Sequence, residues 1–162
     1  MKSLEIIADL EREKKLSLIE KILAVTNGSV TQILEIITGG PVKINTVSQG
    51  VKPAGEVAGS LGVSDADEVN FREVEITDQG GNVLLRAKSW TPLKRLEPEF
   101  RDDLMKADVP IGKLLIEHEI EARRELVDAR IENGNVKRVY NIIRKGEVLM
   151  RIDEEFQDSI NP

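Results

Sequence analysis

The chain has 162 residues, a length typical of one domain, and its 40% hydrophobic and 32% charged residues are the balance of a globular protein with one core. It has no cysteine and a single histidine, which excludes disulfides, thiolate catalysis and metal sites built on several such ligands. A net charge of −6 and only five aromatic residues argue against a nucleic-acid-binding protein.

The chain also lacks targeting and membrane signals. No apolar run reaches the roughly 20 residues that a membrane span needs. The N-terminal segment is broken by charges every few residues and has no apolar block of the kind found in signal peptides. The sequence therefore predicts a single domain over residues 1–162 in the cytoplasm, without nucleic-acid or membrane partners.

The first 40 residues have helical spacing. Apolar residues recur at helical intervals from Leu4 to Leu23 with charges between them, and Asn27-Gly28 is expected to end that helix. Ser29 then begins a second helix, with Gln32 at the spacing of a capping box, and Gly39-Gly40-Pro41 ends it. We therefore expect two helices with an abrupt break between them. The first backbone N–H groups of the second helix should face whatever lies ahead of it.

From Pro41 onward the hydrophobic period changes to two. Short links between the expected strands indicate a largely antiparallel sheet, and two short helices, over 97–106 and from 110 onward, interrupt the strand pattern. The expected strands cover 42–51, 69–77, 83–90, 119–131, 136–145 and 147–156. The predicted fold class is α+β, with helices packed on a six-stranded antiparallel sheet.

Two charged residues fall on faces that should be apolar. Arg72 shares a strand face with Val74 and Ile76, and Glu154 lies among the apolar residues of the last strand. An uncompensated charge on such a face is costly. One explanation is a structural Arg72–Glu154 ion pair, or strand ends where both charges reach water. The other is a concave site in which Arg72 binds an anion and Glu154 handles a hydroxyl or a proton.

Two helix starts also favour an anion site. Gly28-Ser29-Val30-Thr31 and Pro110-Ile111-Gly112-Lys113 each open a short helix, and the free N–H groups of a helix start suit a carboxylate. Plain capping is the alternative explanation for both.

Six segments occur in the order found in the chorismate pyruvate-lyase family, including its archaeal-type branch, and the chain resembles that family over about residues 16–157. The segments are VTNGSVTQILE (25–35), VNFREVEI (69–76), WTPLKRL (90–96), DVPIGKLL (108–115), IEARREL (120–126) and IDEEF (152–156). The resemblance implies the chorismate lyase-like fold, a six-stranded antiparallel sheet with helices packed on it. It also implies conversion of chorismate to 4-hydroxybenzoate and pyruvate without metal or organic cofactor.

The resemblance also implies roles for particular residues. Arg72 in F-R-E-V matches the arginine that holds the ring carboxylate, and Glu154 matches the acidic residue near the ring hydroxyl, so these two form the implied catalytic pair. Val30 and Ile111 match positions whose backbone amides assist substrate binding. Asp153 competes for the acidic position in the alignment, but strand phase favours Glu154.

The same fold serves as the effector-sensing domain of a class of bacterial regulators, so a small-molecule-sensing module that binds an aromatic or sugar-like anion is the alternative function. In those regulators a DNA-binding winged helix precedes the fold. The segment before Ser29 is too short for one, which favours the enzyme.

Overall fold

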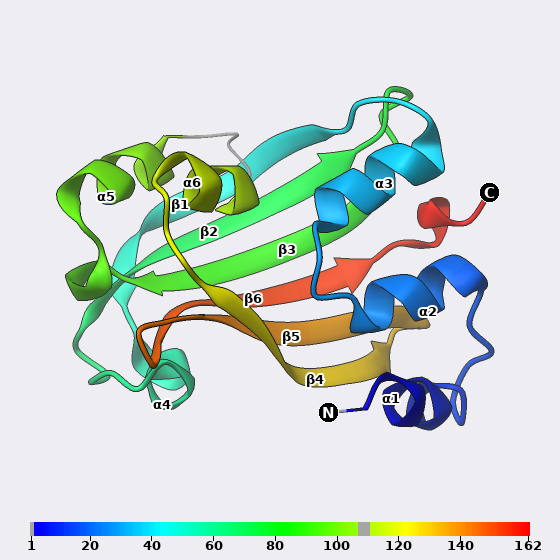
Figure 1. The fold of residues 1–162 in the computed structure, drawn as a ribbon, viewed down its shortest axis with the longest axis horizontal. Helices are drawn as coiled ribbons and strands as arrows, with labels where there is room; N and C mark the ends of the chain where they lie inside the picture. Colours follow the sequence, from blue (N-terminus) through cyan, green and yellow to red (C-terminus); the bar gives the residue numbers. More distant parts are fainter. Residues whose placement is uncertain (1, 107–110) are drawn as a thin grey trace.

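A six-stranded antiparallel sheet in the order β1-β2-β3-β6-β5-β4 organises the chain, in a computed structural model that describes residues 2–106 and 111–162 (Figure 1). The strands are β1 (Lys43–Pro53), β2 (Glu68–Thr77), β3 (Val83–Pro92), β4 (Arg123–Glu132), β5 (Asn135–Arg144) and β6 (Glu147–Phe156). All five neighbouring pairs are antiparallel. The predicted α+β class with a six-stranded antiparallel sheet is confirmed.

The helices are α1 (Ser3–Leu10), α2 (Leu18–Val25), α3 (Val30–Thr38), α4 (Ala58–Leu61), α5 (Pro98–Met105) and α6 (Ile111–Glu117). Short 3-10 turns occupy Gly55–Val57, Leu93–Arg95 and Asp158–Ile160. Within the described residues, no helix has the length and apolar character needed to cross a membrane.

Five of these helices cover one face of the sheet in two separate groups, α1–α3 over one end and α5–α6 over the other (Figure 1). Each group has its own apolar core. Leu23 and Leu34 pack in a cluster with Phe156 under the first group, and Phe100 packs in a cluster with Met150 under the second. Because the two cores are separate, the middle of this face is left to other side chains.

The opposite face of the sheet is covered at one corner by α4. Leu61 there is fully buried in a small cluster with Val69, and Trp90 packs against it. The Trp90 ring also lies 5.5 Å from the ring of Phe71 on the same face. These contacts show that Trp90 is a packing residue at this corner.

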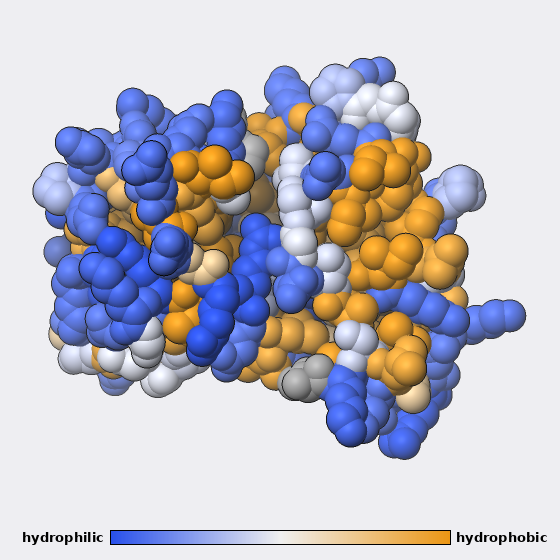
Figure 2. Space-filling model, viewed as in Figure 1, coloured by the Kyte–Doolittle hydropathy of each residue, from blue (hydrophilic) through white to orange (hydrophobic). Residues whose placement is uncertain are grey.

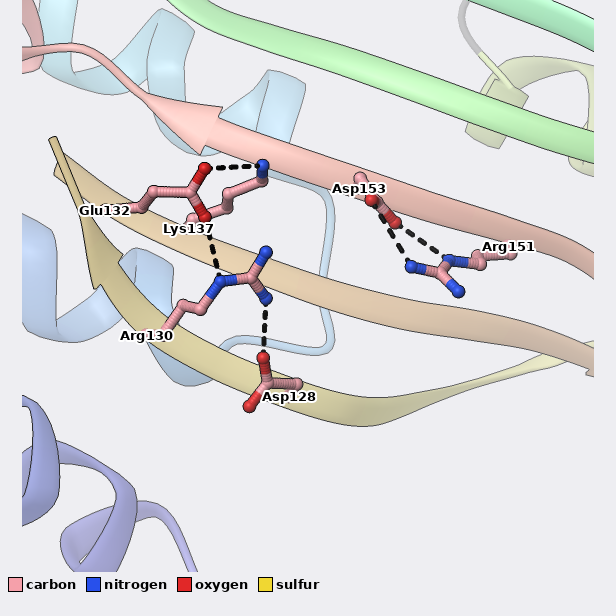
Figure 3. Close-up of polar contacts among 6 residues, drawn as sticks. All are labelled: Asp128, Arg130, Glu132, Lys137, Arg151 and Asp153. Atoms are coloured by element: carbon pink, nitrogen blue, oxygen red, sulfur yellow. Dashed lines mark hydrogen bonds and ion pairs between the residues drawn. The ribbon is translucent and has the colours of Figure 1, made fainter. Parts of the chain in front are cut away.

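Beyond that corner the opposite face carries several ion pairs, with the buried Val139 among them. Figure 3 shows six of its residues: Asp128, Arg130, Glu132, Lys137, Arg151 and Asp153. Arg151 Nε donates to Asp153 Oδ1 at 3.0 Å, and Arg130 bridges Asp128 and Glu132. Partly exposed pairs of this kind contribute little to stability individually, so they mark this face as a solvated one.

The N-terminal helical region differs from the sequence prediction. The expectation of one helix over the first 25 residues was wrong, because α1 ends at Leu10 and α2 begins after Ser17. Ser17 Oγ accepts from Glu20 N at 3.1 Å, and Glu20 Oε1 accepts from Ser17 N at 3.0 Å, which completes a capping box. The S-x-x-E spacing at 17–20 is the signal that could have found this break.

The start of β4 also differs from the prediction. The expected strand from Glu119 begins instead at Arg123. Glu119 has a φ of 53°, a left-handed conformation that ends the turn after α6 and is incompatible with a strand. By contrast, the predicted tight turns of the last two hairpins are confirmed, with positive φ at Asn133-Gly134 and Lys145-Gly146.

Glu20 should contribute to stability in a pH-dependent way. Burial alone would raise the pKa of its carboxyl, but hydrogen bonds from Lys14 and Ser17 outweigh burial and lower the pKa below the ordinary 4.5. The contribution of Glu20 is therefore present above about pH 4.5 and is lost as the pH falls through the lower folded-state pKa.

We expect Glu20→Gln to reduce the free energy of unfolding by about 1.5–3 kcal/mol at pH 7, because hydrogen bonds to a charged group are lost. Denaturant titrations at neutral and acidic pH test this. The difference in stability between the wild type and the variant should narrow as the pH is lowered below 4.5 and Glu20 becomes protonated. Glu13→Gln, at an exposed position of the same segment, is the control. A gap that stays constant with pH would contradict the expected role of the Glu20 charge.

Candidate functional site

A cavity of about 950 Å³ lies over the middle of the sheet, between the two helix groups. Figure 2 shows the surface hollowed between α3 and α6. Its floor is the central part of the sheet: Arg72, Val74, Ala87, Ser89, Tyr140, Ile152 and Glu154. Ala87 and Ser89 on β3 are small, so they leave the space that larger side chains would fill. The start of α3, the start of α6 and residues 122–124 line its walls.

The strand register places Arg72 and Glu154 on two sides of this floor. Arg72 is level with Ser89 on β3, whereas Glu154 is level with Ala87, one step further along the same face. Two strand spacings and one such step separate their Cα atoms by about 12 Å. Both residues are buried. The two predicted site residues therefore face one cavity from different strands.

Glu154 forms an ion pair with Arg138 of β5, and not with Arg72 as one interpretation of the sequence had it. Arg138 Nε donates to Glu154 Oε2 at 2.9 Å, and the two side chains are 1% and 5% exposed. Arg138 Nη1 also donates to the carbonyl of Thr26 at 2.6 Å, and its guanidinium lies 4.9 Å from the Tyr140 ring. These contacts hold the Arg138 guanidinium, and Arg138 in turn holds the Glu154 carboxylate.

Sequence reasoning missed Arg138, although the signal was present. Alternation along β5 puts Arg138 on the face of Val136 and Tyr140, which are both buried. It is therefore a third charge on an apolar face, of the same kind as Arg72 and Glu154.

Tyr140 lies beside this ion pair and lines the cavity. Its burial raises the pKa of the phenol, and the adjacent Glu154 carboxylate raises it further. The phenol is therefore neutral throughout the physiological pH range and can act as a hydrogen-bond donor.

The two candidates for the acidic position in the alignment lie on opposite faces of the sheet. Glu154 lines the cavity, whereas Asp153 lies on the opposite face in its ion pair with Arg151 (Figure 3). The strand-phase argument for Glu154 agrees with this placement.

Both predicted helix starts reach the same cavity. Val30 is the first residue of α3 and Ile111 the first residue of α6, and both line it. Ser29 caps α3, since its Oγ accepts from Gln32 N at 3.2 Å. Pro110, the other predicted element of the second motif, lies outside the described residues.

The cavity carries a local positive charge. Among the described residues that line it, cations outnumber acids by three: Arg72, Lys88, Lys113, Arg123 and Arg124 against Glu117 and Glu154. The chain as a whole has a net charge of −6, so the excess of cations over acids at the cavity is a local feature. A small anion is the ligand that such a cavity attracts.

The fold and the cavity define a small-molecule-binding domain of the chorismate lyase-like fold. The model of the Rv2949c-like chorismate pyruvate-lyases matches residues 24–161. The chain is also 37% identical over 169 residues to a Methanocaldococcus jannaschii protein named "Putative lyase MJ0807", covering 93% of this chain and 84% of that protein. The chain belongs to the Rv2949c-like chorismate pyruvate-lyase family.

The fold also occurs in solved structures of PhnF and of its effector domain. PhnF from Mycobacterium smegmatis superposes with a TM-score of 0.63 at 17% identity over 83% of this chain, which spans 66% of the PhnF chain. The separate effector domain of PhnF gives the same TM-score at 16% identity, with 83% of this chain and 91% of that domain covered. At these identities the likeness establishes the fold alone.

Proposed function

We propose that this protein is a chorismate pyruvate-lyase, which eliminates pyruvate from chorismate and leaves 4-hydroxybenzoate. The observation that supports this best is the cavity floor, where a buried arginine and a buried carboxylate face one space from two strands. In chorismate the ring carboxylate and the ring hydroxyl lie at opposite ends of the ring. An arginine and a carboxylate at opposite sides of one cavity complement that pattern.

Arg72 would hold the ring carboxylate. A guanidinium presents two parallel N–H donors to a carboxylate, and burial strengthens this interaction because water does not screen it. The backbone amides of Val30 and Ile111, at the starts of α3 and α6, would complete the binding of this end of the ring.

Glu154 would accept a hydrogen bond from the ring hydroxyl. Arg138 uses one acceptor position, on Oε2, and an ionised carboxylate offers about four, so Glu154 retains acceptor capacity for the substrate. Because Arg138 is anchored by the Thr26 carbonyl, the carboxylate is held in place before substrate arrives. Such preorganisation removes part of the entropic cost of orienting the substrate.

The elimination breaks one C–H bond and one C–O bond. The proton at the hydroxyl-bearing carbon leaves, its electron pair completes the aromatic ring, and the bond from the ring to the ether oxygen breaks. The departing enolpyruvate gains a proton on its methylene carbon and becomes pyruvate. The chain's task is to orient the ring and to keep water away from it, and the apolar part of the floor, Val74 and Ile152, suits the second task.

Ligand sensing without turnover is the second candidate function, because a cavity lined by several cations can bind an anion without converting it. In that case the cavity would bind an anionic ligand of similar shape and release it unchanged. Binding alone therefore does not separate the two functions, whereas product formation does.

Purified protein incubated with chorismate should release 4-hydroxybenzoate and pyruvate in equal amounts, without added metal or nucleotide. Chromatography measures the first product, and a coupled lactate dehydrogenase assay measures the second. Glu154→Gln, which keeps the size of the side chain and removes its charge, should greatly reduce turnover, whereas Asp153→Asn on the opposite face should not. Binding of 4-hydroxybenzoate with no product from chorismate would contradict the lyase and support the sensor.

A further inference from the structure

Arg124 at the start of β4 is fixed in the wall of the cavity by three other elements. Its Nη1 donates to the carbonyl of Gly28, and its guanidinium lies 5.7 Å from the centre of the Tyr140 ring. A Cβ on Gly112 would lie 3.3 Å from Arg124 Nη2, so the guanidinium also lies close to the backbone of α6. A guanidinium has five N–H donors, and the Gly28 carbonyl uses one of them.

The other cations that line the cavity are less suited to bind a ligand. Lys113 and Arg123 have side chains 64% and 67% exposed and are paired with Glu117 and Glu125, respectively. Lys88 is exposed and alternates with Ala87 and Ser89, which face the cavity. After Arg72, Arg124 is therefore the cation best placed to act within the described part of the cavity.

Arg124 lies at the opposite side of the floor from Arg72. Tyr140, over which its guanidinium sits, is level with Ile152, Ser89 and Arg72 across the sheet. Three strand spacings, about 14 Å, separate the backbones of Arg72 and Tyr140. Tyr140 also adjoins Glu154, so Arg124 belongs to the Glu154 side.

This arrangement complements a particular dicarboxylate. Resting on the proposed function, with the ring carboxylate at Arg72 and the ring hydroxyl at Glu154, a second carboxylate would have to branch from the ring beside the hydroxyl to reach Arg124. Chorismate has this pattern, because its enolpyruvyl ether is attached next to the hydroxyl-bearing carbon. We propose that Arg124 binds the enolpyruvyl carboxylate, and that it selects the dicarboxylate substrate over the monocarboxylate product.

Equilibrium titration with two stable ligands tests this without turnover. The dicarboxylate probe is 3-(carboxymethoxy)-4-hydroxybenzoate, which carries its second carboxylate on an ether beside the hydroxyl, and the monocarboxylate is 4-hydroxybenzoate. Wild-type protein should bind the dicarboxylate about tenfold or more tightly, the ratio expected for one charge-assisted hydrogen bond. Arg124→Met should abolish this preference and change the Kd of 4-hydroxybenzoate by less than about twofold, since charge is lost only at the second carboxylate.

Two further variants keep the test independent of folding defects. Arg124→Lys retains the charge and should retain part of the preference. Arg130→Met, on the solvated face of the same strand, should leave both affinities unchanged.

Equal binding of both ligands by the wild type would overturn the proposal, as would an equal loss of both affinities in Arg124→Met. These outcomes are distinct from a failure of the proposed lyase activity. A protein that prefers the dicarboxylate through Arg124 but forms no product from chorismate supports the Arg124 assignment and contradicts the lyase. A protein that forms product from chorismate but binds both ligands equally supports the lyase and contradicts the Arg124 assignment.

Discussion

Replacing Arg138 by methionine should lower the free energy of unfolding by about 3–5 kcal/mol. Arg138 and Glu154 are 1% and 5% exposed, so the variant leaves the Glu154 carboxylate buried without its ion-pair partner. It also removes the bond from Arg138 Nη1 to the Thr26 carbonyl, which joins β5 to the segment after α2. Chemical denaturation at neutral pH measures the loss.

The double variant Arg138→Met/Glu154→Gln separates the pair from the packing around it. Removing both charges should restore much of the stability lost in Arg138→Met, because no buried charge remains unpaired. Arg130→Met, which breaks partly exposed pairs on the opposite face, should cost less than about 1 kcal/mol. If Arg138→Met lowers the free energy of unfolding by as little as Arg130→Met does, the interpretation of Arg138 and Glu154 as a buried ion pair is wrong.

Arg72→Met should weaken the binding of 4-hydroxybenzoate by about 2–5 kcal/mol, the range found when one partner of a buried charge pair is truncated. The reason is that the ring carboxylate would enter a buried site that no longer offers its main cation. Calorimetric titration gives the affinity, and thermal melts without ligand report on the fold.

The matched control for Arg72 is Arg86→Met on the neighbouring strand. Arg86 pairs with Glu75 on the solvated face and should affect neither ligand binding nor the melting temperature appreciably. If Arg72→Met lowers the melting temperature strongly and leaves the ligand affinity unchanged, Arg72 has a structural role and the assignment of the ring-carboxylate site is wrong.

Much of the candidate site could be predicted from strand alternation. Arg72 and Glu154 each stand out because a charge on an apolar face needs a physical explanation. Alternation does not specify the partner of such a charge, however, because pairing depends on the order of strands in the sheet. Arg138 is next to Glu154 because β5 and β6 are neighbours, whereas β3 lies between the strands of Arg72 and Glu154.

The fold was predictable where local signals are strong and less so where they are short. Hairpin turns with Asn-Gly and Lys-Gly steps were located correctly, since few residues adopt a positive φ. The helix α4 was not found, because its four residues, Ala58–Leu61, are too few to show a helical period. Its burial against β2 and β6 is a tertiary effect that a local pattern does not contain.

The order of the strands has a consequence for how the protein folds. Strands β1–β3 form one meander and β4–β6 another, and the two meet along Leu85–Trp90 and Arg151–Phe156. Each meander pairs strands that follow one another in the chain, whereas the junction joins segments farther apart in the chain and is the slower contact to form. Arg72 belongs to one meander and Glu154 to the other, so the binding site exists only when the two halves have docked. A ligand bound between them acts as a noncovalent cross-link across the junction and adds its binding energy to the docking of the two halves.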